Sequence, residues 1–180
     1  LQASDMLHPQ LPEFEKPCPV VVPVGIDQDP HLRLARDISK RFKTIKFDQL
    51  CSTYNMFLPG LKGGKMSASD PNSFIALTDD KKTVKDKINK YAFSGGQDTL
   101  EEHKKKGGNP DIDVSFQYLR MLLEEDDNKL EQIKSDYKSG KLTTGELKKY
   151  TIEKLTTFLE KHQKEREKAK KNINKFIYKK

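Results

Sequence analysis

The chain has 180 residues, a net charge of +7 at pH 7, and equal hydrophobic and charged fractions of 34%. Regularly spaced Leu, Ile, Val and Phe argue against disorder, and the length suits one domain or two small ones. Two cysteines are too few for a disulfide framework, and because the most apolar run is only strand length and contains a proline, we expect no membrane span.

The positive charge is unevenly placed along the chain. Residues 1–59 carry seven basic and seven acidic side chains, so the whole excess lies in residues 60–180. Residues 160–180 alone hold nine basic and three acidic side chains. This asymmetry indicates a polyanionic partner, although a solvated helix face without any partner has the same composition.

A strand followed by a helix is predicted near the start of the chain. The run PVVVPVGI at residues 19–26 is apolar without alternation, which is typical of a strand covered on both faces. Asp29 is predicted to cap the helix that follows, where apolar residues keep helical spacing. Because ligands of such α/β units bind beyond the carboxyl ends of the strands, a ligand is expected near Gly25, Asp27 and Gln28.

From about residue 78 onward the pattern is helical. Apolar spacing, caps and glycine stops predict five helices there: from Thr78–Asp79 to Gly95, from Asp98 to Gly107, from Asp113 to Glu125, from Leu130 to Tyr137, and from Thr143 or Thr144 (with Glu146) toward Phe176. The predicted fold class is therefore an α/β piece followed by an all-helical piece. A sheet of one to three strands is too small to bury both of its faces.

The loop GLKGGKMSASDPNS at residues 60–73 lies near the end of the predicted α/β piece. Its adjacent glycines allow backbone N–H groups to approach a ligand closely, and successive N–H groups form an anion nest. Lys65 adds a mobile ammonium, and Ser67 and Ser69 add hydroxyl donors, so the loop favours phosphate binding. It is not a Walker loop, because Met66 follows the lysine. An exposed glycine-serine turn without a ligand is the other interpretation.

The order of residues within this loop carries a resemblance. KMSAS at residues 65–69 closely resembles the second signature of the class I aminoacyl-tRNA synthetases. The segments GIDQDPHLRLARDIS, AFSGGQDTLEEHKKKGG, DVSFQYL and TGELKK are similar to tryptophanyl-tRNA synthetases of the eukaryotic and archaeal type, and the resemblance covers nearly the whole chain. The tyrosyl family is the alternative, but it lacks the Phe-Ser-Gly-Gly and Val-Ser-Phe segments.

The resemblance implies a fold. Residues 1–78 are expected to be the C-terminal part of a Rossmann-like nucleotide-binding domain that includes the loop. Residues 79–168 are expected to form an all-α helical anticodon-binding domain, and residues 169–180 the end of its last helix. None of the four histidines belongs to the family's His-x-Gly-His type signature, so the chain is expected to be the C-terminal half of a larger enzyme and inactive alone.

The resemblance also implies roles in ATP binding. Lys65 maps to the lysine that stabilises the departing pyrophosphate, and is the predicted catalytic residue. The rest of the ATP site is expected to comprise Met66, Ser67, Ala68, Ser69, Gly25 and Asp27. Ala68 stands where the general class I signature has a second lysine, and we hypothesise that Lys62 partly substitutes for it.

Three further residues are assigned to tryptophan by the resemblance. Gln2 and Gln28 map to glutamines of the tryptophan pocket. Asp5 maps to a position where bacterial relatives use a carboxylate to accept the indole N–H, but a helix cap or a surface acid is equally consistent. No protein metal ligand is expected, because Mg²⁺ would bridge the phosphates of ATP.

The function implied is tryptophan–tRNA ligation: ATP-dependent formation of tryptophanyl-adenylate from L-tryptophan, then transfer to tRNA(Trp). The resemblance further implies a homodimer in the cytoplasm and makes the basic excess a tRNA phosphate footprint. Phe93, Phe116 and Tyr118 lie at core spacing and are predicted to be packing residues. A non-catalytic tRNA-binding or interaction module remains the alternative class of function.

Overall fold

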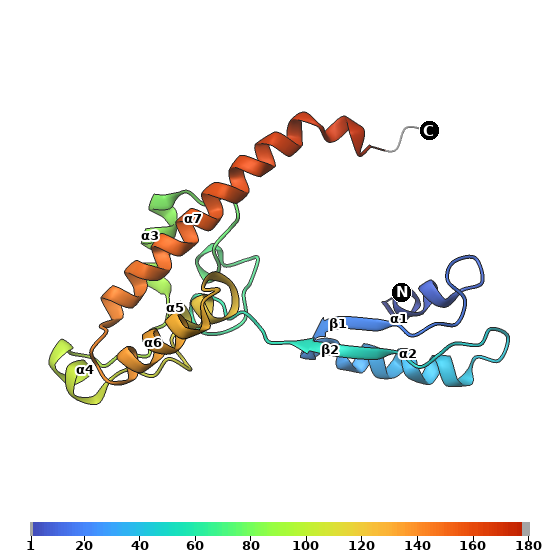
Figure 1. The fold of residues 1–180 in the computed structure, drawn as a ribbon, viewed down its shortest axis with the longest axis horizontal. Helices are drawn as coiled ribbons and strands as arrows, with labels where there is room; N and C mark the ends of the chain where they lie inside the picture. Colours follow the sequence, from blue (N-terminus) through green and yellow to red (C-terminus); the bar gives the residue numbers. More distant parts are fainter. Residues whose placement is uncertain (1, 178–180) are drawn as a thin grey trace. The chain divides into compact units, whose positions relative to one another are not determined.

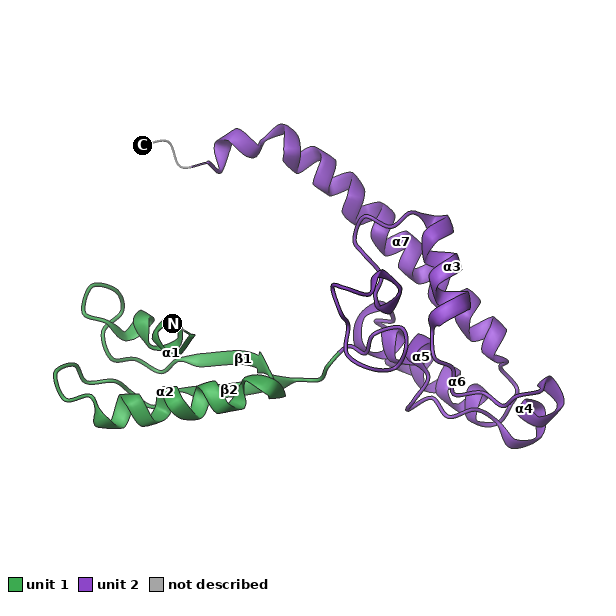
Figure 2. Ribbon diagram, turned by 180° about the vertical axis from the view of Figure 1, so that it is seen from behind, with its two compact units in different colours: residues 1–57 green, residues 58–180 purple. Residues whose placement is uncertain are grey.

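The computed structural model describes residues 2–177, so the last three residues of the predicted C-terminal segment 169–180 lie outside it. The chain divides into two compact units, residues 1–57 and residues 58–180 (Figure 2). The lysine loop therefore belongs to the second unit, and the domain boundary predicted after residue 78 stays a prediction. Within the described range, no helix is both long enough and apolar enough to cross a bilayer.

The first unit is a strand–helix–strand arrangement with a short helix before it (Figure 1). Strands β1 and β2 pair in parallel, with Val21 opposite Cys51 and Gly25 opposite Asn55. The predicted strand and helix are confirmed, and the second strand completes a βαβ unit. The elements are α1 (Gln2–Leu7), η1 (His8–Gln10), β1 (Val21–Gly25), η2 (Ile26–Gln28), α2 (Asp29–Arg41) and β2 (Cys51–Asn55).

Only one face of this small sheet is covered. Val22 and Val24 pack toward α1 and α2 on a core made of Met6, Leu7, Leu32, Ala35 and Leu50. On the opposite face Val21 is 59% exposed. The prediction that β1 is covered on both faces is therefore wrong for the described residues, because both helices of this unit lie on the same side of the strands.

The second unit is helical, and its described residues contain no strand. Helix α7 packs against α3 and α5. The elements are η3 (Pro71–Ser73), α3 (Lys81–Tyr91), α4 (Leu100–Lys106), α5 (Val114–Tyr118), η4 (Leu119–Leu123), α6 (Asp127–Lys138), α7 (Thr144–Lys171) and η5 (Ile173–Lys175).

Side-chain caps define where these helices begin. The predicted capping box is present at α7, where Thr143 and Glu146 bond each other's backbone amides. Two predicted starts are wrong by one residue, since Asp80 caps α3 and Thr99 caps α4. At α3 the reason is visible, because the carboxylate of Asp79 is held by Lys87 instead.

The predicted helix from Asp113 to Glu125 changes character halfway. Asp113 caps α5, and from Leu119 the chain continues as one turn of π-helix, η4, which ends before Glu124. The carboxylate of Glu124 accepts bonds from Tyr150 and Lys154 of α7. The helix therefore ends at a residue that α7 holds, a point that apolar spacing does not reveal.

The core of the second unit lies between α3, α5, η4 and α7. Phe116 and Tyr118 are 1% and 2% exposed, which confirms that they are packing residues. Phe93 is 48% exposed, so the prediction that it packs in the core is wrong. It follows the end of α3 and lies beside Gly63 of the lysine loop, where a Cβ would be 3.5 Å from the Phe93 Cβ.

Candidate active site

The two glutamines predicted to bind tryptophan are brought together. The side-chain amide of Gln2 in α1 donates a hydrogen bond to the side-chain oxygen of Gln28, although 26 residues separate them. Gln28 ends η2, just beyond the carboxyl end of β1, and is half-buried, whereas Gln2 is exposed. This bond leaves the side-chain nitrogen of Gln28 and the side-chain oxygen of Gln2 for other partners. Both groups lie at the edge of the sheet where α/β units bind their ligands.

Gly25 and Asp27 lie at the same edge. A Cβ on Gly25 would be 2.9 Å from a carboxylate oxygen of Asp27 and 3.1 Å from the ring of Phe57. A side chain at position 25 would collide with Asp27 and Phe57, so glycine allows this strand end to lie close to both residues. Asp27 is exposed, so its carboxylate is accessible beside the Gln2–Gln28 pair.

Asp29 has a different role from the predicted one. Gln28 is the residue that precedes α2, and Asp29 forms its first turn without capping it. The carboxylate of Asp29 instead accepts a hydrogen bond from the hydroxyl of Tyr54 in β2. It also forms an ion pair with Arg33 at 2.6 Å. These contacts, Tyr54 first, lower the pKa of Asp29 and tie the start of α2 to the second strand.

Asp5 lies apart from the glutamine pair in its described contacts. It is exposed on α1, and its backbone oxygen, 3.2 Å from a ring nitrogen of His8, makes the contact that the structure records. Its assignment to the indole N–H therefore stays a prediction, with the surface acid as the alternative.

The lysine loop is folded on itself by backbone bonds. The amide of Leu61 donates to the carbonyl oxygen of Ser73 at 2.7 Å, and the amide of Gly60 to that of Gly64 at 2.6 Å. A Cβ on Gly60 would be 2.8 Å from the Ser73 oxygen, so no other residue fits there without displacing backbone. Gly63 has a φ of 84°, a left-handed conformation that favours glycine.

The buried hydroxyl of Ser73 closes the loop from inside. It accepts the amide proton of Ser67 at 3.0 Å and donates to the carbonyl oxygen of Asp70 at 2.7 Å. The hydroxyls of Ser67 and Ser69 are 2.8 Å apart on the exposed side. The predicted phosphate donors Ser67 and Ser69 are thus adjacent.

The two lysines of the loop differ in their surroundings. Lys62 donates to the carboxylate of Asp70 at 2.6 Å, and this bond, with the Asn72 amide, holds the pKa of Asp70 below its ordinary value. Lys65 is exposed, as are Met66 and Ala68, and within residues 2–177 no ion pair engages its ammonium. Lys65 is therefore the cation of this loop that is ready to bind an anion.

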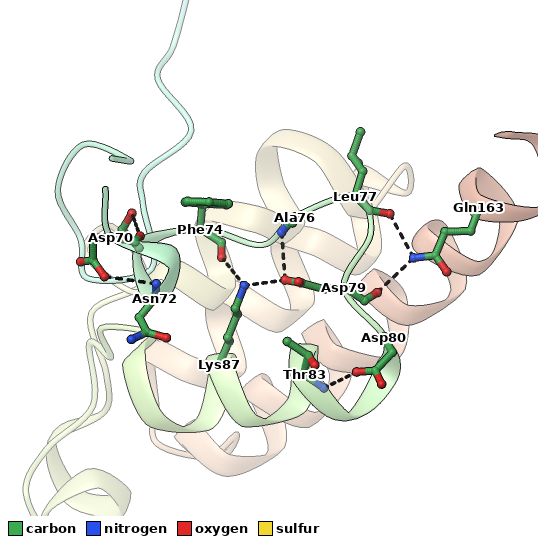
Figure 3. A network of polar contacts seen from close by, with 11 residues as sticks. Asp70, Asn72, Phe74, Ala76, Leu77, Asp79, Asp80, Thr83, Lys87 and Gln163 are labelled. Atoms are coloured by element: carbon green, nitrogen blue, oxygen red, sulfur yellow. Dashed lines mark hydrogen bonds and ion pairs between the residues drawn. The ribbon is translucent and has the colours of Figure 1, made fainter. Parts of the chain in front are cut away.

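The segment that leaves the loop is held by side-chain contacts that the sequence did not predict (Figure 3). Lys87 of α3 pairs with Asp79 at 2.7 Å, and both side chains are only 12% and 13% exposed. Asp70 also accepts the amide proton of Asn72 and thereby caps the short helix η3. The Asp-Pro-Asn-Ser run is the sequence signal for that turn, but nothing local predicts the partner of Asp79.

Comparison with known proteins agrees with this arrangement. The family model described as tRNA synthetases class I (W and Y) matches residues 1–160. The tryptophan–tRNA ligase of Sulfurisphaera tokodaii is 58% identical over 160 residues, which are 88% of this chain and 41% of that protein. The human cytoplasmic tryptophan–tRNA ligase is 53% identical over 148 residues, or 81% of this chain and 31% of that protein.

A solved structure supports the same relationship. The tryptophanyl-tRNA synthetase of the archaeon Aeropyrum pernix superposes with a TM-score of 0.89 at 42% identity, covering 94% of this chain and 46% of that one. The chain thus spans less than half the length of the relatives it matches. With a family model matched over residues 1–160, it has the Rossmann-like class I fold and belongs to the class I tRNA synthetases of the tryptophan and tyrosine group.

Proposed function

We propose that the protein containing these 180 residues is a tryptophan–tRNA ligase, which activates L-tryptophan with ATP and transfers it to tRNA(Trp). The observation that carries the proposal is the lysine loop, whose backbone is closed by Ser73 while Lys65 stays unpaired among the described contacts. The relatives at 53% and 58% identity bear this name, which favours tryptophan over tyrosine as the amino acid.

In this proposal each part of the site has one task. Gln2 and Gln28 bind tryptophan at the end of β1, with Asp5 a further candidate. Gly25 and Asp27 adjoin the ATP, and the loop from Lys65 to Ser69 receives its phosphates. The reaction requires the tryptophan carboxylate to attack the α-phosphorus, so positioning and charge stabilisation supply most of the acceleration.

The ammonium of Lys65 stabilises the negative charge that develops on the departing pyrophosphate. Such a contact raises the rate only if it is stronger in the transition state than with bound ATP, and an exposed lysine on a flexible stem is able to meet that requirement. Mg²⁺ would enter with the nucleotide, bound mainly by phosphate oxygens.

The helical part is proposed to bind tRNA, as an anticodon-binding domain over residues 79–168. Its support is the positive charge on α7, where Lys161 and Lys164 are exposed and no ion pair among the described residues engages them. Phosphate contacts from such side chains give affinity without reading sequence. A homodimer and a cytoplasmic location are proposed on the family resemblance alone.

The decisive test is amino-acid-dependent exchange of pyrophosphate into ATP by the full-length protein. We expect exchange with tryptophan and none with tyrosine at the same concentration. Exchange with tyrosine alone would assign the other specificity, and tRNA binding without any exchange would leave a non-catalytic binding module. The 180 residues alone are proposed to be inactive, because a two-stranded sheet with one bare face cannot form a closed ligand site.

A further inference from the structure

The segment between the lysine loop and α3, residues 74–80, is attached to two helices. The ammonium of Lys87 in α3 donates to the carboxylate of Asp79 at 2.7 Å and to the carbonyl oxygen of Phe74 at 3.2 Å. The same carboxylate oxygen accepts the amide proton of Ala76 at 2.9 Å. This segment is therefore held by an ion pair that is largely shielded from water.

The second attachment comes from α7. The side-chain amide nitrogen of Gln163 donates to the backbone carbonyl oxygens of Leu77 and Asp79, both at 3.0 Å (Figure 3). The first bond joins residues 86 positions apart in the sequence. Both protons of one amide are thus used on the segment that leaves the loop.

Residues 74–80 follow directly after Ser73, the residue that closes the lysine loop. Four positions before Leu77, Ser73 holds the loop closed through the amide of Ser67 and, by its carbonyl oxygen, the amide of Leu61. Ser67 is two residues after Lys65. The hydrogen bonds on residues 74–79 and those of Ser73 are joined by the covalent backbone between Phe74 and Ser73, so α7 is connected to the backbone that carries the lysine.

We propose that Gln163 is a positioning residue for Lys65: by fixing residues 77–79 on α7, it sets the loop geometry in which the ammonium reaches the pyrophosphate. This inference rests on the proposed function, since it assigns to Gln163 an effect on the transition state that Lys65 stabilises. Small displacements of a catalytic group lower the rate strongly, even when the displaced contact is remote from the reacting atoms.

A purely structural role predicts a different result. Leu77 is 52% exposed, so water can reach its carbonyl group when Gln163 is replaced, and the core of the second unit does not include Gln163. Losing the two bonds should lower the unfolding temperature by only a few degrees. A loss of catalytic rate at temperatures where the variant remains fully folded is what distinguishes positioning from support of the fold.

The test uses the full-length protein with Gln163→Met, which keeps side-chain length and removes both donors. We expect kcat of tryptophan-dependent pyrophosphate exchange to fall about tenfold, with KM for tryptophan unchanged. Backbone amides of residues 65–69 should exchange hydrogen faster. Gln163→Lys, which restores an N–H donor at similar reach, should recover most of the rate. The control is Glu160→Met, an exposed change three positions earlier on α7 that should leave kcat unchanged.

The dependence on Lys65 separates the two proposals. If Gln163 acts through Lys65, its replacement should have no further effect on the residual rate of Lys65→Ala, measured at high enzyme concentration. An equal tenfold loss in both backgrounds, or an unchanged kcat in Gln163→Met while Lys65→Ala is impaired, overturns the positioning role alone. Full exchange activity in Lys65→Ala overturns the proposed function itself.

Discussion

The hydroxyl oxygen of Ser73 lies 3.0 Å from the amide nitrogen of Ser67 and accepts its proton. Ser73 is only 4% exposed, whereas Ser67 lies on the open side of the loop. One buried hydroxyl thus fixes the backbone on which Lys65, Ser67 and Ser69 are displayed. A loop that is closed before ligand binding has less conformational entropy to lose when a ligand binds.

The two lysines of the loop should differ in their contributions to catalysis. Lys65→Ala should lower kcat of tryptophan-dependent pyrophosphate exchange about 100- to 1000-fold, the usual range for removing one donor to a developing oxyanion. Lys62→Ala should cost far less, because its ammonium is bound to Asp70. Steady-state exchange assays on both variants provide the comparison. An equal loss in both would support the hypothesis that Lys62 substitutes for the second signature lysine.

Much of this arrangement was predictable because it is local. The strand before Gly25 and the capping box at Thr143 both follow from residues within a few positions of each other. The family resemblance assigned Gln2 and Gln28 to the same pocket, but neither it nor the spacing predicted the hydrogen bond between them. Local pattern also located the helices of the second unit, though not the turn where α5 becomes π-helical.

What the sequence did not reveal depends on partners far along the chain. Asp79 looks like a cap, but Lys87 holds its carboxylate, and Gln163 reaches the same segment from α7. Phe93 has core spacing, yet it is exposed because the chain leaves α3 just before it. Propensity and periodicity describe one element at a time, so contacts between elements override them.

Replacing the glutamine pair should affect tryptophan binding selectively. Gln28→Ala should raise KM for tryptophan about tenfold with KM for ATP unchanged, because one hydrogen bond to the ligand is removed. Gln2→Ala should have a smaller effect that is not additive with it, since Gln2 donates to Gln28. Gln49→Ala, an exposed glutamine before β2, is the control. Unchanged tryptophan KM in both variants would remove the pair from the pocket.

The attachment of Glu124 to α7 should make stability depend on acid pH. The hydroxyl of Tyr150, followed by the ammonium of Lys154, lowers the pKa of Glu124 below its ordinary value of 4.5. The stabilisation is therefore fully present above pH 4.5 and is lost as pH falls through the lowered pKa. Glu124→Gln should reduce the unfolding temperature at pH 7, and the difference from wild type should shrink toward pH 3.

Thermal unfolding of the full-length protein between about pH 7 and pH 3 measures this difference. Glu125→Gln is a matched control, since it neutralises the adjacent, exposed carboxylate. A difference for Glu124→Gln that stays constant with pH would mean that its ionisation does not contribute to folding.

The lysines on α7 should determine how tRNA binding depends on salt. Lys168 and Lys170 pair with Glu165 and Glu167 on the same helix, which reduces their availability. Three other exposed lysines, Lys161, Lys164 and Lys171, are better placed to neutralise phosphates. Replacing these three by glutamine should weaken tRNA binding at low salt and flatten the plot of log affinity against log salt. The slope should change by about one for each phosphate that the protein no longer neutralises.

A variant with the same change in charge provides the comparison. Lys16, Lys40 and Lys43 are exposed on the first unit, and replacing them by glutamine should leave the salt slope unchanged. Equal effects of the two triple variants would indicate attraction by net charge alone, as the composition allows. A change confined to the α7 variant would place the phosphate contacts on this helix, because non-specific attraction does not depend on which lysines are removed.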